Sequence, residues 1–195
     1  KLWPFWKNRF TLGTSSMDLK KHIRTVLDFP IKGIEFRDIT SLVENPQSFN
    51  YALMQLTNEC MDFKADKIVG IESRGFVFGA PLARDLEVPF VMARKPGKLP
   101  GQCYTQGYEL EYGEASLSIQ CNSPIVSTDK VVIIDDLIAT GGTAIACADI
   151  LYNAFDVAKE NILVLALIDL PDLKGSAIIQ EQGYNVKTLV EFEGT

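Results

Sequence analysis

A repeated alternation of short apolar runs with segments of helical periodicity is the feature that most constrains this chain. Strands are expected at residues 67–72, 88–93, 130–134, 162–168 and 185–192. Helices are expected at residues 75–86, 143–155 and 174–182. Strands that are apolar on both faces and alternate with helices are typical of a parallel sheet covered on both sides. The pattern therefore predicts an α/β fold with a central, mostly parallel sheet flanked by helices.

The rest of the chain shows weaker patterns. Apolar residues of 18–27 fall on one helical face, so a helix is expected there, followed by a loop over 31–39. Asn45 is expected to cap a second helix that begins at Pro46 and runs to about Phe63. Two alternating runs, 108–112 and 115–119, flank Gly113 and predict an antiparallel hairpin.

Length and charge limit the class of protein. The chain has 195 residues, 47% of them hydrophobic, and a formal net charge of -6. We expect an N-terminal extension or added leader over 1–16 and a single domain over 17–195. An acidic surface disfavours binding to nucleic acid. No apolar run is long enough to cross a membrane, and residues 1–16 lack the pattern of a signal peptide, so a cytoplasmic protein is expected.

Cysteine and histidine content excludes several chemistries. The four cysteines include no Cys-x-x-Cys pair, which disfavours zinc, and we interpret them as reduced thiols in a cytosolic protein. His22 is the only histidine and is expected in an exposed helix. Mechanisms that depend on a Ser-His-Asp or Cys-His arrangement therefore lose most of their support.

The most informative segment begins with an apolar strand that delivers two carboxylates, Asp135 and Asp136. A Thr140-Gly141-Gly142-Thr143 loop then opens a helix, where backbone N–H groups, threonine hydroxyls and the helix dipole favour a phosphate. Carboxylates only accept hydrogen bonds, so the two acids suit sugar hydroxyls instead. The alternative is a tight turn with Asp136 as a cap. The agreement of acids, loop and strand–helix context favours a ribose-phosphate site.

Two further segments suit an anion. Ser73-Arg74-Gly75 follows a strand and opens a helix, and Arg74 can donate two hydrogen bonds to phosphate oxygens. Arg94, Lys95 and Lys98 form a basic cluster in an otherwise acidic chain. Taken alone, each segment is also explained without a ligand, by a helix-capping arginine and by a solvated charged loop.

These segments together resemble a known family. The stretch from Val131 to Ala144 is similar to the phosphoribosyl-pyrophosphate (PRPP) motif of the type I phosphoribosyltransferases. Four more segments resemble the adenine phosphoribosyltransferase family and occur in the same order, and the resemblance covers residues 18–192. They are Phe36-Arg37-Asp38-Ile39-Thr40, Glu72-Ser73-Arg74-Gly75-Phe76, Arg94-Lys95-Pro96-Gly97-Lys98-Leu99-Pro100 and Leu110-Glu111-Tyr112-Gly113.

The resemblance implies a fold, a reaction and partners. The fold is that of type I phosphoribosyltransferases, with the hairpin as part of a flexible lid. The reaction transfers the 5-phosphoribosyl group of PRPP to N9 of adenine and gives AMP and pyrophosphate, as in purine salvage. The implied cofactor is Mg²⁺, held mainly by substrate rather than by a protein metal cage. The implied assembly is a homodimer in which some cations of the basic cluster reach the neighbouring subunit's PRPP.

The resemblance also assigns residues to PRPP. The implied PRPP and AMP contacts are Asp135, Asp136, Ala139, Thr140, Gly141, Gly142 and Thr143. The implied pyrophosphate contacts are Ser73, Arg74, Arg94, Lys95 and Lys98. Arg74 is also expected to take part in catalysis, and the family pattern implies a cis peptide bond between Glu72 and Ser73.

The base is assigned in the same way. Phe36, Arg37 and Leu170 are expected to contact adenine, partly through the backbone around Glu35 and Arg37. Glu111 is expected to hold or donate a proton at N7, with Tyr112 of the lid shielding the site. The residues alone leave alternatives, because Phe36 also suits a core and Glu109 shares a strand face with Glu111.

Two other functions remain open. A phosphoribosyltransferase for a 6-oxopurine or a pyrimidine would share the PRPP motif, but a 6-oxopurine needs a donor such as lysine. No lysine directly follows Asp169, and Lys174 comes only later. A PRPP-sensing regulator would need a winged-helix extension or a broad basic face, and the chain shows neither.

Overall fold

The computed structural model describes residues 16–110 and 113–194. The chain forms two compact units, one up to Gln55 and the other from Leu56 onward. The second unit contains the central sheet and every strand–helix turn that the sequence assigns to phosphate groups.

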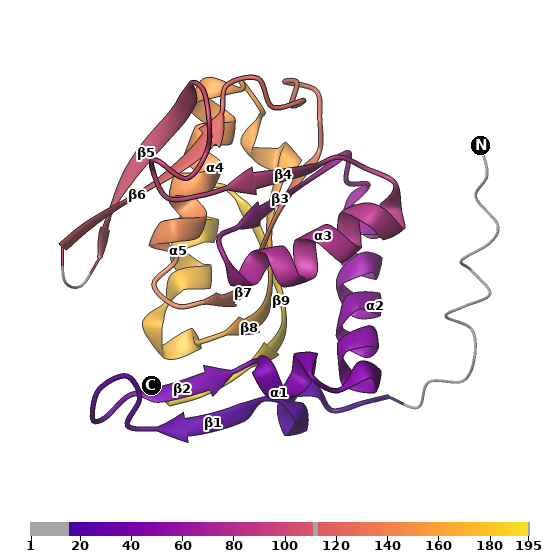
Figure 1. The fold of residues 1–195 in the computed structure, drawn as a ribbon, viewed down its shortest axis with the longest axis vertical. Helices are drawn as coiled ribbons and strands as arrows, with labels where there is room; N and C mark the ends of the chain where they lie inside the picture. The colour runs from indigo at the N-terminus through magenta and orange to yellow at the C-terminus, as the bar shows by residue number, and fades with distance from the viewer. Residues whose placement is uncertain (1–15, 111–112, 195) are drawn as a thin grey trace. The chain divides into compact units, whose positions relative to one another are not determined.

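The second unit is built on a five-stranded parallel sheet in the order β4-β3-β7-β8-β9 (Figure 1). The strands are β3 (Lys67–Ile71), β4 (Phe90–Ala93), β7 (Val131–Ile138), β8 (Ile162–Asp169) and β9 (Asn185–Glu191). Every residue of β8 is buried, as expected for a strand covered on both faces. The predicted α/β fold with a mostly parallel sheet is confirmed.

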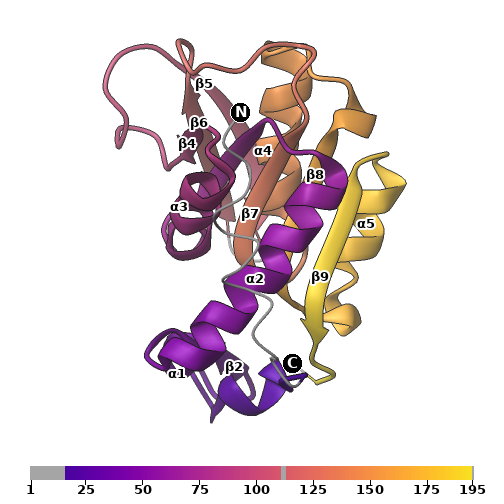
Figure 2. The same cartoon turned by 90° about the vertical axis from the view of Figure 1, so that its right-hand side faces the viewer.

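Helices cover both faces of this sheet (Figure 2). The helices are α3 (Arg74–Leu86), α4 (Gly142–Ala154) and α5 (Gly175–Glu181). α3 packs so closely on β7 that a Cβ at Gly79 would lie 2.7 Å from the Ile134 side chain. Ile133 points to the other face, where it joins the core formed with α4 and with Ile179 of α5. The alternation along β7 therefore distributes its side chains between the two helical layers.

The strand order sets the place of the site. From β3 the chain moves first to β4 on one side, then crosses to β7 on the other side. A doubly wound sheet binds ligands where the strand order reverses, outside the carboxyl ends of the strands. In this sheet that point lies between β3 and β7.

The predicted hairpin is present and longer than expected. It consists of β5 (Cys103–Leu110) and β6 (Gly113–Gln120), which pair antiparallel outside the main sheet. A single antiparallel bridge between Arg94 and Ser118 ties β6 to the segment that follows β4. This bridge connects the hairpin to the basic cluster through Arg94.

The first unit contradicts two predictions. Residues 18–27 form a 3₁₀ helix, Leu19–His22, followed by strand β1 (Arg24–Leu27) instead of one α-helix. The expected loop over 31–39 contains strand β2 (Glu35–Asp38), which pairs antiparallel with β1. The helical periodicity was misleading because cross-strand pairing overrides local propensity in so short a segment.

The remaining helices of the chain agree better with the sequence. α1 (Thr40–Val43) is a single turn, and α2 (Pro46–Phe63) has the predicted bounds. Asn45 accepts hydrogen bonds from the N–H groups of Gln47 and Ser48, so the predicted cap is confirmed. Leu56 and Cys60 of α2 are buried.

Two further observations concern the thiols and the lengths of the helices. All four cysteines are free thiols, with Cys60 and Cys147 buried. Among the residues that the structure describes, every helix is too short or too polar to cross a membrane.

Asp38 is predicted to stabilise the antiparallel pair of strands β1 and β2 in a pH-dependent way. Hydrogen bonds from the Thr40 side chain, from Arg24 and from the Thr40 N–H lower the pKa of Asp38 to about 2. Because the folded pKa lies below the unfolded value of about 3.9, the stabilisation is present at neutral pH and is lost as pH falls from about 4 to 2. Asp38→Asn should therefore lower the Tm by a few degrees at pH 7 and by much less at pH 2.5.

Thermal unfolding followed by circular dichroism at both pH values tests this prediction. Asp62→Asn removes the same charge from an exposed position and serves as the control. Equal losses for Asp38→Asn at the two pH values would contradict the proposed ionic stabilisation.

Candidate active site

The two acids of the predicted sugar site lie within β7, not after its end as the sequence suggested. β7 continues to Ile138 because β8 pairs with it up to Asp169, whereas β3 pairs with β7 only up to Gly70–Ile134. Asp135 and Asp136 therefore lie on the part of β7 that extends past β3. This places them beside the turn that follows β3.

That turn supplies the partner of Asp136. Arg74 begins α3, and its Nε atom lies 3.1 Å from Oδ2 of Asp136 in an ion pair. The carboxylate is almost fully buried, with 1% of Asp136 exposed, whereas the Arg74 side chain is 45% exposed. The peptide bond between Glu72 and Ser73 is cis, which confirms the family expectation. The structure thus brings the predicted ribose and pyrophosphate segments together across the β3–β7 boundary.

Asp135 and Asp136 have different surroundings, because successive residues of a strand point to opposite faces. Asp136 faces Arg74 on the α3 side. Asp135 lies toward α4, where burial and the negative charge of Asp135 raise the pKa of the Cys147 thiol. Burial raises the pKa of both carboxyl groups, and repulsion by Asp136 raises that of Asp135 further. Arg74 opposes the rise at Asp136. A cation or hydroxyl donors bound here would favour the ionised pair.

The predicted phosphate loop connects β7 to α4. Gly141 has φ of +83°, a left-handed conformation that glycine adopts without strain, and no side-chain hydrogen bond caps the helix that follows. Thr140 is exposed, and Thr143 is half-buried in the first turn of α4. An uncapped helix N-terminus of this kind leaves backbone N–H groups available to a phosphate.

The sequence did not single out Gly175, which supports this loop. A Cβ at Gly175 would lie 2.1 Å from the Ala139 carbonyl oxygen and 2.8 Å from the Gly141 nitrogen. Such distances are impossible for a real side chain, so the loop keeps its position only while residue 175 is glycine. The available signal was a glycine at the start of a helix, which is too common to indicate a phosphate loop.

The basic cluster follows β4 and is fixed at one residue. The Arg94 guanidinium donates to Glu72 at 2.9 Å and to the Lys98 carbonyl oxygen at 3.1 Å. Lys95 and Lys98 have exposed side chains. Because β3, β4 and β7 are parallel, the cluster lies at the same edge of the sheet as Arg74 and the acids.

The predicted base contacts are distributed over three places. Leu170 is buried directly after β8, and its N–H donates to the Ile138 carbonyl oxygen, so it lies at the same sheet edge. Phe36 and Arg37 lie on β2 of the first unit. Glu111 and Tyr112 lie outside the described residues. The assignment of all five residues to the base therefore stays a prediction.

On β2 the two predicted base residues are held by local contacts. Phe36 packs edge-on against Phe29, with ring centroids 5.1 Å apart. The Arg37 side chain is buried, and it donates to the Thr25 hydroxyl and to Glu35, both at 2.7 Å. Its guanidinium is thus engaged in joining β1 to β2.

The groups along this edge of the sheet differ in charge between β7 on one side and β3 and β4 on the other. Buried carboxylates and an uncapped helix N-terminus lie on β7 and the start of α4, and cations lie beyond β3 and β4. This suits a ligand with sugar hydroxyls and a terminal phosphate on one side and a strongly anionic group on the other. A phosphorylated ribose bearing pyrophosphate meets this description.

Comparison with known proteins agrees with this description. The family model of the phosphoribosyl transferase domain matches residues 39–174. The chain is 43% identical over 178 residues to an adenine phosphoribosyltransferase from Nitrosospira multiformis, covering 91% of this chain and 99% of the relative. It is 46% identical over 178 residues, with the same coverage, to an adenine phosphoribosyltransferase from Desulfosudis oleivorans.

Solved structures extend the similarity to the fold. Adenine phosphoribosyltransferase from Thermoanaerobacter pseudethanolicus matches with a TM-score of 0.81 and 41% identity, covering 89% of this chain and 98% of that one. The Giardia lamblia enzyme complexed with 9-deazaadenine matches with a TM-score of 0.83 and 32% identity, covering 91% and 99%. The Trypanosoma brucei enzyme in complex with AMP, pyrophosphate and ribose-5-phosphate matches with a TM-score of 0.77 and 25% identity, covering 89% and 77%.

The chain therefore belongs to the phosphoribosyltransferase family. Within that family, its relatives place it among the adenine phosphoribosyltransferases.

Gly175→Ala is predicted to displace the phosphate loop. Because the new methyl group would overlap the Ala139 carbonyl, the loop must move, and we expect ribose 5-phosphate to bind roughly tenfold more weakly. Isothermal titration calorimetry measures the affinity. Gly107→Ala is the control, since its Cβ would meet no atom closer than 3.9 Å. Unchanged affinity in Gly175→Ala would contradict the role of this glycine.

Proposed function

We propose that this chain transfers the 5-phosphoribosyl group from PRPP to N9 of adenine, giving AMP and pyrophosphate. The observation that carries the proposal is the Arg74–Asp136 ion pair, which joins the turn after β3 to the acids of β7. It brings a predicted pyrophosphate residue within contact of a predicted ribose residue at the reversal of the strand order. The relatives named above, which are adenine phosphoribosyltransferases, support the choice of reaction.

The sugar end of PRPP is assigned to β7 and α4. Residues 139–143 would bind the 5-phosphate through backbone N–H groups and threonine hydroxyls. Asp135 and Asp136 would accept hydrogen bonds from the ribose 2- and 3-hydroxyls. Departure of pyrophosphate runs ahead of attack by N9, so the ribose becomes oxocarbenium-like. Acids fixed beside the ribose orient it and stabilise that positive charge.

The leaving group is assigned to the cations. Ser73 and Arg74 would bind pyrophosphate at the start of α3, and Lys95 and Lys98 would offset the negative charge that develops on it. Arg94 belongs to the same segment. Arg74 would then exchange its contact with Asp136 for pyrophosphate oxygens, or share the two.

The base is assigned to the residues that the family resemblance implies. Leu170, directly after β8, would cover one face of adenine, and the resemblance alone assigns Phe36 and the backbone near Arg37 to the same base. Glu111 would hold a proton at N7, and Tyr112 would exclude water as the lid closes.

We propose Mg²⁺ as the cofactor. The carboxylates of Asp135 and Asp136 offer the oxygen ligands that this hard cation prefers, and the substrate's phosphates and hydroxyls offer the rest. Within the described residues no group of three metal-ligating side chains is found. Bound there, Mg²⁺ would neutralise pyrophosphate charge.

We also propose a cytoplasmic homodimer. Four free thiols suit a reducing compartment. The family resemblance implies that some cations of the basic cluster reach the neighbouring subunit's PRPP, and Lys95 and Lys98 have exposed side chains.

AMP formation from adenine and PRPP tests the proposed reaction. We expect turnover with adenine in the presence of Mg²⁺, loss of turnover with EDTA, and no product with hypoxanthine or guanine. Asp136→Asn should lower kcat/KM roughly 100-fold, since it removes a charge beside the developing cation. Turnover with an oxopurine alone would contradict the base assignment. PRPP binding without turnover of any base would favour a regulator.

Mixing two inactive variants tests the dimer. If Lys95 and Lys98 act across the interface, subunits carrying Asp136→Asn and subunits carrying both Lys95→Ala and Lys98→Ala form hybrids with one intact site. About one quarter of wild-type activity should then return after co-refolding equal amounts. Each variant refolded alone is the control. No recovery, or a monomer by light scattering, would contradict the proposal.

A further inference from the structure

Glu72 is a half-buried carboxylate to which the proposed reaction assigns no role. It directly follows β3 and directly precedes Ser73 and Arg74, the residues assigned to pyrophosphate. A negative charge next to a pyrophosphate site should weaken binding of that anion by repulsion. The residue therefore needs a reason, and its contacts provide one.

Both oxygens of the Glu72 carboxylate bind the segment after β4. Oε1 accepts from Nη2 of Arg94 at 2.9 Å, and Oε2 accepts from the Lys95 N–H at 3.1 Å. The Glu72 side chain is 18% exposed and the Arg94 side chain 28%. The hydrogen bond from Arg94 lowers the pKa of Glu72, so the carboxylate is ionised at neutral pH. One side chain thus holds two successive residues of the basic cluster.

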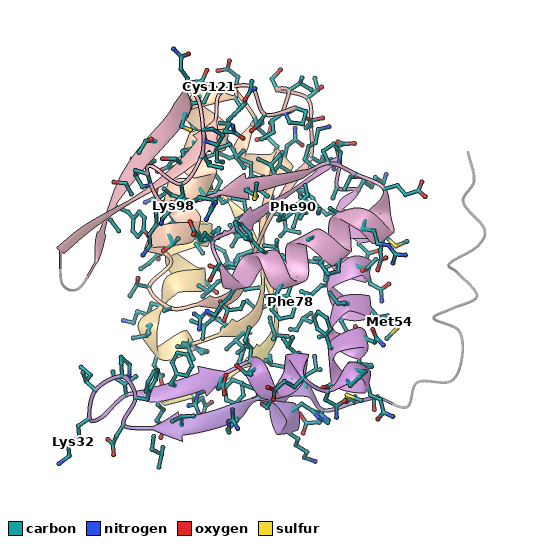
Figure 3. All side chains as sticks on the ribbon, viewed as in Figure 1. Lys32, Met54, Phe78, Phe90, Lys98 and Cys121 are labelled. Carbon is teal, nitrogen blue, oxygen red and sulfur yellow. The ribbon has the colours of Figure 1, made fainter. Side chains whose placement is uncertain are left out.

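Arg94 carries this restraint further along the segment. Its Nη1 donates to the Lys98 carbonyl oxygen at 3.1 Å, and its backbone exchanges two hydrogen bonds with Ser118 of β6. The Lys98 N–H donates to the Lys95 carbonyl oxygen at 3.2 Å, which closes a turn between the two lysines. Figure 3 shows Lys98 between the end of β4 and the β5–β6 hairpin. The backbone of residues 94–98 is therefore restrained by Glu72, by Ser118 of β6 and by hydrogen bonds within the segment itself.

The lysines differ from Arg94 in this respect. Lys95 and Lys98 are exposed, and within the described part of the chain neither makes an ion pair. Arg94 forms the internal links, and the two lysines remain available to an external anion. A backbone that is ordered before binding reduces the loss of conformational entropy on binding.

We propose that Glu72 is a positioning residue for pyrophosphate, which acts by holding residues 94–98 so that Lys95 and Lys98 can bind the anion. This inference rests on the proposed function. The restraint operates whichever subunit's Ser73–Arg74 turn holds the pyrophosphate. It also explains a carboxylate beside an anion site, since Arg94 neutralises its charge.

The sign of one substitution distinguishes this role from simple repulsion. Glu72→Gln keeps the size of the side chain, removes its charge and leaves one oxygen for two donors. If Glu72 only repels pyrophosphate, the variant binds the anion more tightly. If Glu72 positions the segment, the variant binds pyrophosphate and PRPP about tenfold more weakly, because two charge-assisted contacts are lost or weakened.

Calorimetric titration of the full chain with pyrophosphate, together with steady-state kinetics, makes the measurement. The KM for PRPP should rise about tenfold in Glu72→Gln, and the KM for adenine should change less than about twofold. A purely structural defect would move both constants. Glu160→Gln removes an exposed charge elsewhere and is the matched control. Equal or tighter pyrophosphate binding by Glu72→Gln would overturn the proposal.

A double-mutant cycle with Arg94→Gln tests the route. If Glu72 acts through Arg94, the double variant loses little more affinity than either single variant. Additive losses would assign the two residues to independent roles and overturn the proposed link. Should Glu72→Gln fail to fold, Glu72→Asp keeps the charge but is too short to reach both donors, and the same loss is expected. Absence of PRPP and pyrophosphate binding in the wild type would instead refute the proposed function.

Discussion

The rest of the site depends on the register of β7 between its two neighbours. β3 stops pairing at Gly70–Ile134, but β8 continues to pair with β7 as far as Ile138–Asp169. The unequal ends leave Asp135 and Asp136 on a strand that is paired on one side only. The turn after β3 fills the other side, which is why Arg74 reaches Asp136. A site built from two turns is thus positioned by backbone pairing within the sheet.

Close backbone contacts hold the turns at the distances that this register allows. A Cβ at Gly75 would lie 2.4 Å from the Ile134 carbonyl oxygen, and one at Gly175 would lie 2.1 Å from that of Ala139. The first contact seats α3 on β7 just before the acids, and the second seats the phosphate loop against the start of α5. In both places the missing side chain is the functional property of the residue. Neither glycine touches a reactant in the proposed mechanism, yet each sets the position of residues that do.

The sequence predicted the second unit well because its signals are local there. The apolar run of β7, the acids, and the Gly141–Gly142 turn lie within a dozen residues and specify strand, site and helix together. It failed where partners are distant. Residues 24–27 become a strand only because β2 pairs with them, and the sequence predicts a loop in place of β2. Gly175 and Glu72 were missed for the same reason, since their contacts lie 34 to 36 and 22 to 23 residues away in the chain.

The charge distribution of the site follows from these contacts and favours one orientation of the proposed substrate. The chain is acidic overall, at -6, and its cations near the site lie beyond β3 and β4 while its buried acids lie on β7. Pyrophosphate bound at the acids would be repelled by two carboxylates whose ionised form burial already disfavours. Ribose hydroxyls bound at the cations would not compensate the positive charge there. In the proposed reaction, PRPP would therefore bind with its pyrophosphate at the cations and the phosphate of its ribose at the uncapped α4 N-terminus. Glu72 agrees with this division of charge. It is an acid on the pyrophosphate side, but its carboxylate binds Arg94 and the Lys95 N–H and does not face the ligand in the proposed mechanism.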